Sequence, residues 1–339
     1  MNDTQIMEVV TLVEQAEAEL QDGHEAAALM RLDTAMPTIR DALQQAVAQP
    51  DTTLALRLAG GLWRYWHIRG SLAEGQSWLE QALAGSEEVA PAVRAKAFDG
   101  AGVMAMDQGR LADSRAYHEQ ALALYQDLGD TQLVAGNYES LGCLAMLEGD
   151  HVTAASTFEQ SLALRQQLGD ADAIVSTLLN LTSNAVVAKD LPTAQAWMAQ
   201  ARSHEAQITS DQLRTHLLAS AAMLAFEAQD YAQTTALSRE TLRQSLERGA
   251  TNQVLLSLEG LAAAAIETNQ PAQAARLYGA AAVRYEATGI QAVNQANPDR
   301  PARIARGEQQ LGAEQWAIVW EAGRQMDAVA LLAAVEGPA

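Results

Sequence analysis

The chain has 339 residues and a formal net charge of −20, with 22 lysines and arginines against 42 acidic side chains. Hydrophobic residues make up 49%, too many for a disordered chain. The acidic excess argues against a general nucleic-acid binder, because phosphate binding needs clustered basic side chains. Cys143 is the single cysteine, so a disulfide within the chain is excluded. Neither lysine, Lys96 or Lys189, lies in a GxxxxGK[ST] motif, which excludes a P-loop NTPase.

Segments that would direct the chain to a membrane are not found in the sequence. No apolar run approaches the ~18–20 residues of a membrane-spanning helix. The first residues also lack the basic and then apolar pattern of a secretory signal. The sequence therefore predicts a soluble, cytoplasmic protein.

Residues 1–54 are expected to form an N-terminal helical cap. They hold two or three helical segments, with turns near Asp22-Gly23 and Pro50-Asp51. From Asp3 to Glu25 the segment carries seven acidic side chains and no basic one.

After the cap, two sequence markers recur with the same spacing. A pair of turn-forming residues begins at Gly109, Gly149, Lys189, Gln229 and Asn269, which are 40 residues apart each time. Leu-Gly-Asp at 128–130 and again at 168–170 has the same spacing. Two independent markers at one period predict an internal repeat.

Each period contains two helical patterns separated by a tight turn. In residues 135–170, one apolar stripe ends before Gly149, and a second runs to Gly169, which suits the position after a helix C-terminus. A helix pair cannot bury its stripe alone, so neighbouring pairs must stack into an all-α solenoid. Six pairs are expected across residues 55–290, at about 56–94, 95–134, 135–174, 175–214, 215–254 and 255–290.

Residues 291–339 break the period and are expected to cap the other end. Gln291 to Arg303 contains two prolines and is predicted to be a loop. Helices over about 304–322 and 325–335 then follow. The whole chain is expected to be one continuous solenoid with capped ends.

The units resemble tetratricopeptide repeats (TPRs), lengthened from about 34 residues to 40. The best match is residues 135–170, where Leu141-Gly142, Ala154 and Phe158 occupy the family's characteristic positions. This resemblance implies a right-handed superhelix that binds proteins or peptides on its concave face.

A more specific resemblance covers nearly the whole chain. The stretch from Leu56 to Trp66, the repeated ending at Leu122–Asp130 and Leu162–Asp170, and the close from Ala274 to Ala281 are similar to one repeat region. That region is the C-terminal half of MalT/LuxR-type STAND bacterial transcriptional regulators. It would receive an inducer or a partner there, although the ATPase and DNA-binding domains of such regulators are absent from this sequence.

The resemblance predicts binding residues on the first helix of each pair, which lines the concave face. The groove-facing and neighbouring candidates are Arg57, Arg64, His67, Lys96, Asp99, Met106, Asn137, Glu139, Asn180, Ser183, Asn184, His216 and Met223. Met146 and Leu179 occupy further groove-facing positions. This mixture of charges and methionines suits a protein or peptide segment of mixed polarity, or a small inducer.

Other motifs favour packing over chemistry. Gly100 to Ala105 matches the dinucleotide fingerprint GxGxxA, but it lies inside an expected helix and follows no strand. The six histidines show no metal-ligand spacing, so neither a metal nor a cofactor is expected. Cys143 is expected to be a buried, inert thiol.

Two clusters have both a structural and a functional interpretation. The aromatic group Trp63, Tyr65, Trp66 and Trp78 could seal the junction between the cap and the first pair, or line a ligand pocket with Arg64 and His67. Arg300, Arg303 and Arg306 form a local basic group, for which pairing within the chain is favoured.

The sequence therefore predicts a non-enzymatic binding module, the sensor part of a bacterial signalling or transcriptional regulator. A free-standing oligomerising scaffold is one alternative. A hydrolase that uses groove carboxylates is another, and it would need a pocket of converging, perturbed acids. The sequence names no ligand.

Overall fold

The structure, a computed structural model, describes residues 1, 3–21, 25–248, 250–288 and 299–336. All regular structure in these ranges is helical, and no strand occurs in them. The chain divides into two compact units, Met1–Leu168 and Gly169–Ala339, and each is described here by itself. The expectation of one continuous solenoid stays a prediction.

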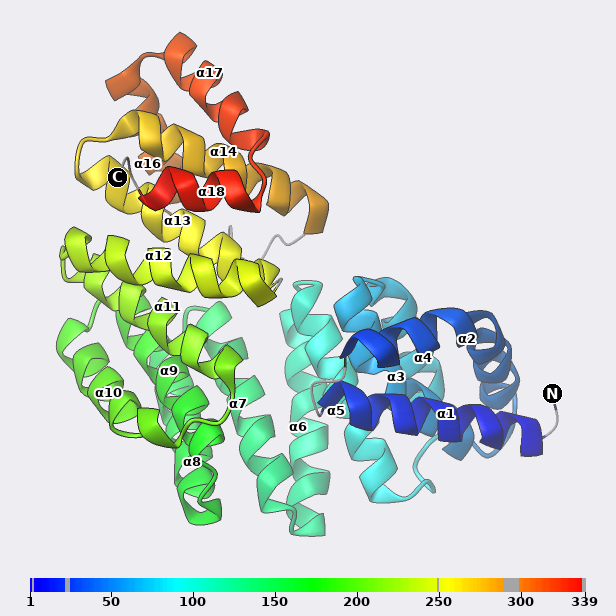
Figure 1. Cartoon of the computed structure of the whole chain (residues 1–339). Coiled ribbons are helices and arrows are strands. Elements are labelled where there is room, and N and C mark those ends of the chain that lie inside the picture. Colours follow the sequence, from blue (N-terminus) through cyan, green and yellow to red (C-terminus); the bar gives the residue numbers. More distant parts are fainter. Residues whose placement is uncertain (2, 22–24, 249, 289–298, 337–339) are drawn as a thin grey trace. The chain divides into compact units, whose positions relative to one another are not determined.

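Unit 1 consists of four antiparallel helix pairs (Figure 1). We call the earlier member of each pair its first helix and the later member its second helix. The pairs are α1 (Asp3–Gln21) with α2 (Glu25–Val47), α3 (Thr53–Arg69) with α4 (Leu72–Leu83), α5 (Pro91–Asp107) with α6 (Leu111–Leu128), and α7 (Thr131–Leu147) with α8 (His151–Leu168). The first helices α1, α3 and α5 pack side by side, as stacked helix pairs require.

Unit 2 continues with three pairs and then departs from the pattern. The pairs are α9 (Ala171–Val187) with α10 (Leu191–Ser203), α11 (Asp211–Glu227) with α12 (Tyr231–Arg248), and α13 (Thr251–Glu267) with α14 (Pro271–Thr288). A short 3-10 turn, η1 (Glu205–Gln207), follows α10. Three more helices follow, α16 (Arg300–Leu311), α17 (Ala313–Arg324) and α18 (Ala328–Glu336). Helix α17 packs along α14, while α18 contacts α12.

The tight turns lie where the 40-residue period predicts them. Gly109 and Gly149 have φ values of 73° and 80°, and the equivalent Lys189, Gln229 and Asn269 have φ of 61°, 62° and 56°. Left-handed backbone is easy for glycine and costs other residues about 1–2 kcal/mol. The non-glycine residues still adopt it because the same pair of turn hydrogen bonds closes each helix.

Small residues set how closely the helices approach. A Cβ atom on Gly142 would lie 2.6 Å from the ring of Phe158 on α8. Where α14 and α17 cross, the approach is closer, because Gly279 faces the backbone carbonyl of Trp320 and Gly323 faces that of Arg276. These glycines allow backbone-to-backbone packing that no larger residue would permit.

The C-terminal helices differ from the prediction. The expected loop at 291–303 lies outside the described residues up to 298, but α16 already begins at Arg300. Pro301 occupies the first turn of that helix, where its missing N–H has no partner to lose. The predicted single helix at 304–322 is also wrong, since Gly312, with φ of 87°, separates α16 from α17.

A search of the described helices for a segment long and apolar enough to cross a membrane finds no candidate.

Candidate functional site

The predicted binding residues lie on first helices in both units. In unit 1 they come from α3 (Arg57, Arg64, His67), α5 (Lys96, Asp99, Met106) and α7 (Asn137, Glu139). In unit 2 they come from α9 (Asn180, Ser183, Asn184) and α11 (His216, Met223). We call the surface formed by the unit 1 residues, together with Glu14 and Glu17 of α1, the first-helix face.

Ion pairs connect neighbouring helices across the first-helix face. The guanidinium of Arg57 donates two hydrogen bonds of 2.8 Å to the carboxylate of Glu14 on α1. Lys96 on α5 pairs with Glu17, also on α1, so this contact crosses α3. Sequence reasoning placed both cations on this face but missed both glutamates, which lie in the cap and outside the repeat period.

Glu17 is the buried member of this network. Its side chain is 6% exposed, and burial raises its pKa, an effect that the positive charges of Lys96 and Arg64 oppose. One of its oxygens, Oε1, has no hydrogen-bond partner among the described residues. A buried carboxylate with an unused acceptor is costly, and removing its remaining partner, Lys96, would make the cost larger. The negative charge of Glu17 also attracts the guanidinium of Arg64.

Arg64 is a cation of the first-helix face that no other described residue neutralises by an ion pair. Its guanidinium lies 4.4 Å from the ring centroid of Trp63. Within the part of the chain that the structure describes, it makes no hydrogen bond and no ion pair. Its Nε is buried without a hydrogen-bond partner, so an incoming acceptor would have to bind the terminal nitrogens of this stacked guanidinium.

His67 and Asp107 form a further contact between α3 and α5. The imidazole Nδ1 lies 2.7 Å from Oδ2 of Asp107, and the hydrogen bond to that carboxylate raises the pKa of His67. The histidine is therefore protonated at a higher pH than a free one.

Asp99 and Asn137 meet at a histidine that sequence reasoning missed. Nδ2 of Asn137 donates to Oδ1 of Asp99 over 3.1 Å, and Nδ1 of His118 lies 3.4 Å from each partner. His118 is fully buried on α6, and Asn137 is 2% exposed. Asn137 is therefore a buried residue that holds the Asp99 carboxylate in place by a hydrogen bond. The sequence feature that could have indicated His118 is Gly102, a glycine inside the first helix of the pair. A Cβ atom on Gly102 would lie 2.6 Å from the His118 ring, so the glycine makes room for this side chain.

The remaining candidates of unit 1 lie at the far end of the face. Glu139 pairs with Arg165 of α8, and Met106 is half-buried on α5. Cys143, predicted to be a buried thiol, is half-buried near Glu139, and loss of hydration raises its pKa to about 12. A thiol with so high a pKa is a poor nucleophile.

The unit 2 candidates are buried or half-buried. Asn184 is 3% exposed, while Asn180, Ser183 and His216 are half-buried. Met223 packs against the apolar cluster of α9 and α10. Whether any of these residues binds a partner stays a prediction.

Several packing interpretations are confirmed. A Cβ on Gly100 would lie 2.7 Å from Trp63, so the GxGxxA stretch is a helix contact. Trp66 is fully buried against Gly75 of α4, whereas Tyr65 reaches the cap by donating to Asp33 of α2 over 2.9 Å.

The arginines of α16 pair within the chain, as favoured from sequence. Arg300 lies 2.8 Å from the buried Glu259, Arg306 pairs with Glu267, and Arg303 stacks on Phe226 at 4.9 Å. In the described ranges, no group of three or more histidine, cysteine or acidic side chains is placed to hold a metal ion.

Comparisons with known proteins agree with this architecture. Residues 93–167, which include most of α5 to α8, match the tetratricopeptide repeat family model. No curated protein matches the sequence.

Solved structures share the fold at low sequence identity. A Rap protein in complex with the Competence and Sporulation Factor is 11% identical, with a TM-score of 0.60 over 95% of this chain and 99% of that one. The apo quorum sensor NprR from B. thuringiensis is also 11% identical, with a TM-score of 0.55 over 98% of this chain and 99% of that one. The chain therefore has the fold of an α-solenoid built from TPR-like helix pairs.

Proposed function

We propose that this chain is a non-catalytic binding module whose first-helix face receives a protein or peptide segment. The observation that carries the proposal is the state of Arg64. Its guanidinium is stacked on Trp63, close to a buried carboxylate, and has no hydrogen bond or ion pair within the described ranges. A cation held in this way is ready to donate hydrogen bonds to a carboxylate or a carbonyl oxygen of a partner.

The other cations of the first-helix face would orient a bound segment more than they would add to its affinity. Arg57 and Lys96 are each already paired with a glutamate, and about 29% and 41% of their side chains are exposed. Charges fixed in this way cost little further ordering when a partner binds. A bound segment would carry an acidic or carbonyl group for Arg64, with basic groups placed for Asp99 and Glu139.

The wider context is also a proposal. The resemblance to the repeat region of STAND regulators, and the fold shared with a quorum sensor and with a Rap protein bound to a factor, support the sensor part of a bacterial signalling or transcriptional regulator. A protein or peptide segment is the partner that the face fits best, with a small inducer as the second possibility.

The test compares one variant on the face with a matched variant away from it. The purified chain is screened against an array of ten-residue peptides that differ in charge pattern, and binding is measured by fluorescence anisotropy. Arg64→Ala is expected to weaken the selected peptides about tenfold or more, because a charge-assisted contact is lost. Arg40→Ala is the control, since Arg40 pairs with Glu74 between α2 and α4, away from the first-helix face.

Asn180→Ala tests the unit 2 candidates in the same screen. If the selected peptides bind the Arg64→Ala variant as tightly as the original chain, the proposal for the first-helix face is wrong, whatever the Asn180→Ala variant does. A chain that selects no peptide from the array would also contradict it.

A further inference from the structure

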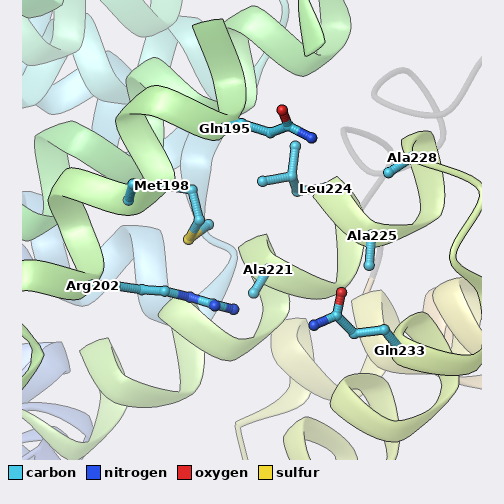
Figure 2. Close-up of a pocket in the computed structure, with 9 residues that line it drawn as sticks. Gln195, Met198, Arg202, Ala221, Leu224, Ala225, Ala228 and Gln233 are labelled. Atoms are coloured by element: carbon cyan, nitrogen blue, oxygen red, sulfur yellow. The ribbon is translucent and has the colours of Figure 1, made fainter. Parts of the chain in front are cut away.

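A cavity of about 260 Å³ lies in unit 2, between α10, α11 and α12. Figure 2 shows Arg202 and Gln195 entering it from α10, Ala221 and Leu224 from α11, and Gln233 from α12. None of its lining residues belongs to the predicted groove, so the cavity is a feature separate from the site described above.

Two departures from the repeat produce this cavity. The 40-residue period places Ala221 at the position of Leu141, Leu181 and Leu261, three leucines that are 9%, 1% and 2% exposed, while the equivalent residue of α5, Ala101, is also an alanine. The same period places Arg202 at the position of Leu122, Leu162 and Leu242, of which the last two are buried. One leucine has therefore been shortened to a methyl group. The other has become a side chain whose charged end must stay solvated, so the space that two leucines fill elsewhere stays open.

An ion pair that one other repeat has is also missing at this place, as it is at the equivalent Ala155 and Ala188. In the α6–α7 region, Arg115 and Glu148 pair between the two helices. The residues 80 positions later are Gln195 and Ala228, which line the cavity and cannot form such a pair. The contact that joins the helices in one repeat is thus missing where the cavity lies.

One positively charged side chain, the exposed Arg202, lines the cavity. Arg202 makes no hydrogen bond or ion pair with any residue the structure describes, and none of the described lining residues is acidic. Most other arginines of this chain, whose net charge is −20, form ion pairs, although Arg64 and Arg276 do not within the described residues. Figure 2 shows the Arg202 guanidinium and the Gln233 amide extending toward each other from opposite walls.

Apart from Gln195, the remaining lining residues are apolar. Met198, Leu224 and the alanines of α11 form the wall beside Arg202. A guanidinium fork with a neighbouring amide donor matches the two oxygens of a carboxylate, while a methionine and a leucine accept hydrocarbon. The volume is just below the range of about 300–1,000 Å³ typical for drug-sized ligands, which indicates a small ligand or the end of a larger one.

We propose that this cavity binds a monocarboxylate with a compact apolar tail. The carboxylate lies against Arg202 and accepts from the Gln233 amide, and the tail lies on Leu224 and Met198. One negative charge matches one cation. A phosphate, with a charge of about −1.5 to −2, would leave excess negative charge in an already acidic chain.

Benzoate is the probe for the first test, and benzamide is its neutral match. The chain is labelled with ¹³C at the methionine methyl groups, and the Met198 signal is assigned by its loss in Met198→Leu. Benzoate is expected to shift this signal in a saturable way. Benzamide, which has nearly the same shape without the charge, is expected to shift it at least about tenfold less at equal concentration.

Three variants connect the effect to the cavity. Arg202→Gln is expected to weaken benzoate about tenfold or more, while Arg276→Gln, which removes an exposed arginine of α14, leaves binding unchanged. Ala221→Leu introduces the leucine found at the equivalent position of α7, α9 and α13, and is expected to fill the cavity and abolish binding. Because this leucine fits at the equivalent positions, the variant should keep its helical circular dichroism and melt no lower than the original chain.

A pair of tetrapeptides distinguishes the source of the carboxylate. A peptide with a free C-terminal carboxylate that displaces benzoate, when its C-terminal amide does not, identifies a chain terminus as the ligand. If neither peptide competes while benzoate still binds, the cavity takes free small acids. The proposal is overturned if benzamide shifts Met198 as strongly as benzoate, or if Arg202→Gln or a folded Ala221→Leu still binds benzoate at the original affinity.

Discussion

Three glycine-to-alanine changes within one repeat should alter stability in different directions. Gly136 lies inside α7, and no atom lies within 4 Å of the position that an alanine methyl group would take, so alanine gains its helix propensity, about 1 kcal/mol. Gly149 has φ of 80°, where alanine costs about 1–2 kcal/mol, partly offset by about 0.4–1 kcal/mol from a more restricted unfolded chain.

Gly142 should be the most damaging of the three. Its alanine methyl group would lie 2.6 Å from Phe158, a side chain that is fully buried and has no free space to enter. Overpacking of this kind costs about 1–3 kcal/mol, and the upper end applies here, so about 2 kcal/mol remains after the helix-propensity gain. The expected order of stability is Gly136→Ala, then the original chain, then Gly149→Ala, then Gly142→Ala.

Hydrogen exchange of peptides that cover α7 and α8 measures these effects locally, with urea unfolding followed by circular dichroism as the global measurement. The chemical change is the same in all three variants, so each serves as the control for the others. If the three variants change the free energy of opening in the same direction, the assignment of the three glycines to helix interior, helix contact and turn is wrong.

Three further predictions concern ionisable groups. The contact with Asp107 raises the pKa of His67, so it stabilises the fold below pH ~6.5, and this stabilisation is lost as the pH rises through the pKa of the folded state. His67→Gln should therefore lower the free energy of unfolding by under about 1 kcal/mol at pH 5.5 but not at pH 8.5. An equal loss at both pH values would contradict this role of the contact. Iodoacetamide should label Cys143 far more slowly at pH 8 in the folded chain than in urea, because a pKa near 12 lowers the thiolate fraction on the order of 10³-fold. Mass spectrometry measures the labelling rates, and equal rates in the two states would contradict the desolvation of the thiol in the folded chain. Arg300→Ala leaves Glu259 buried without this partner and should lower the free energy of unfolding by about 3–5 kcal/mol at pH 7.5. The decrease should be smaller at pH 5, because the Glu259 carboxyl has a raised pKa and can be protonated there. Urea unfolding at the two pH values tests this, and a decrease that does not depend on pH would contradict it.

The repeat period accounts for how much of the fold could be predicted. The period placed every tight turn correctly, including those where Lys189 and Gln229 stand in place of glycine. It gave no information where the repeat ends. Pro301 suggested a loop, but the first turn of a helix accepts proline. Gly312 lies in a segment that otherwise has the apolar periodicity of one helix, and its positive φ nevertheless ends α16.

The candidate site was predictable only in part, for a similar reason. The register of the first helices predicts that Arg64 and Lys96 share a face, and both lie on first helices of unit 1, while their role in binding stays a prediction. Their surroundings depend on residues distant in sequence, such as Glu17, which is 79 residues before Lys96. The cavity at Arg202 could have been found from sequence, by comparing the leucine positions of successive repeats one by one.

The pair between Glu17 and Lys96 has a consequence for how unit 1 assembles. It joins α1 to α5 across α3, at a point where Gly60 lies against α5 and Gly61 against α1, so that the middle helix is thin enough to be bridged. Repeat proteins are usually described by interactions between nearest neighbours alone. Here a contact forms only when three successive first helices are already stacked. Its free energy is therefore shared by two interfaces at once, and the first three helix pairs should fold and unfold as a single cooperative block.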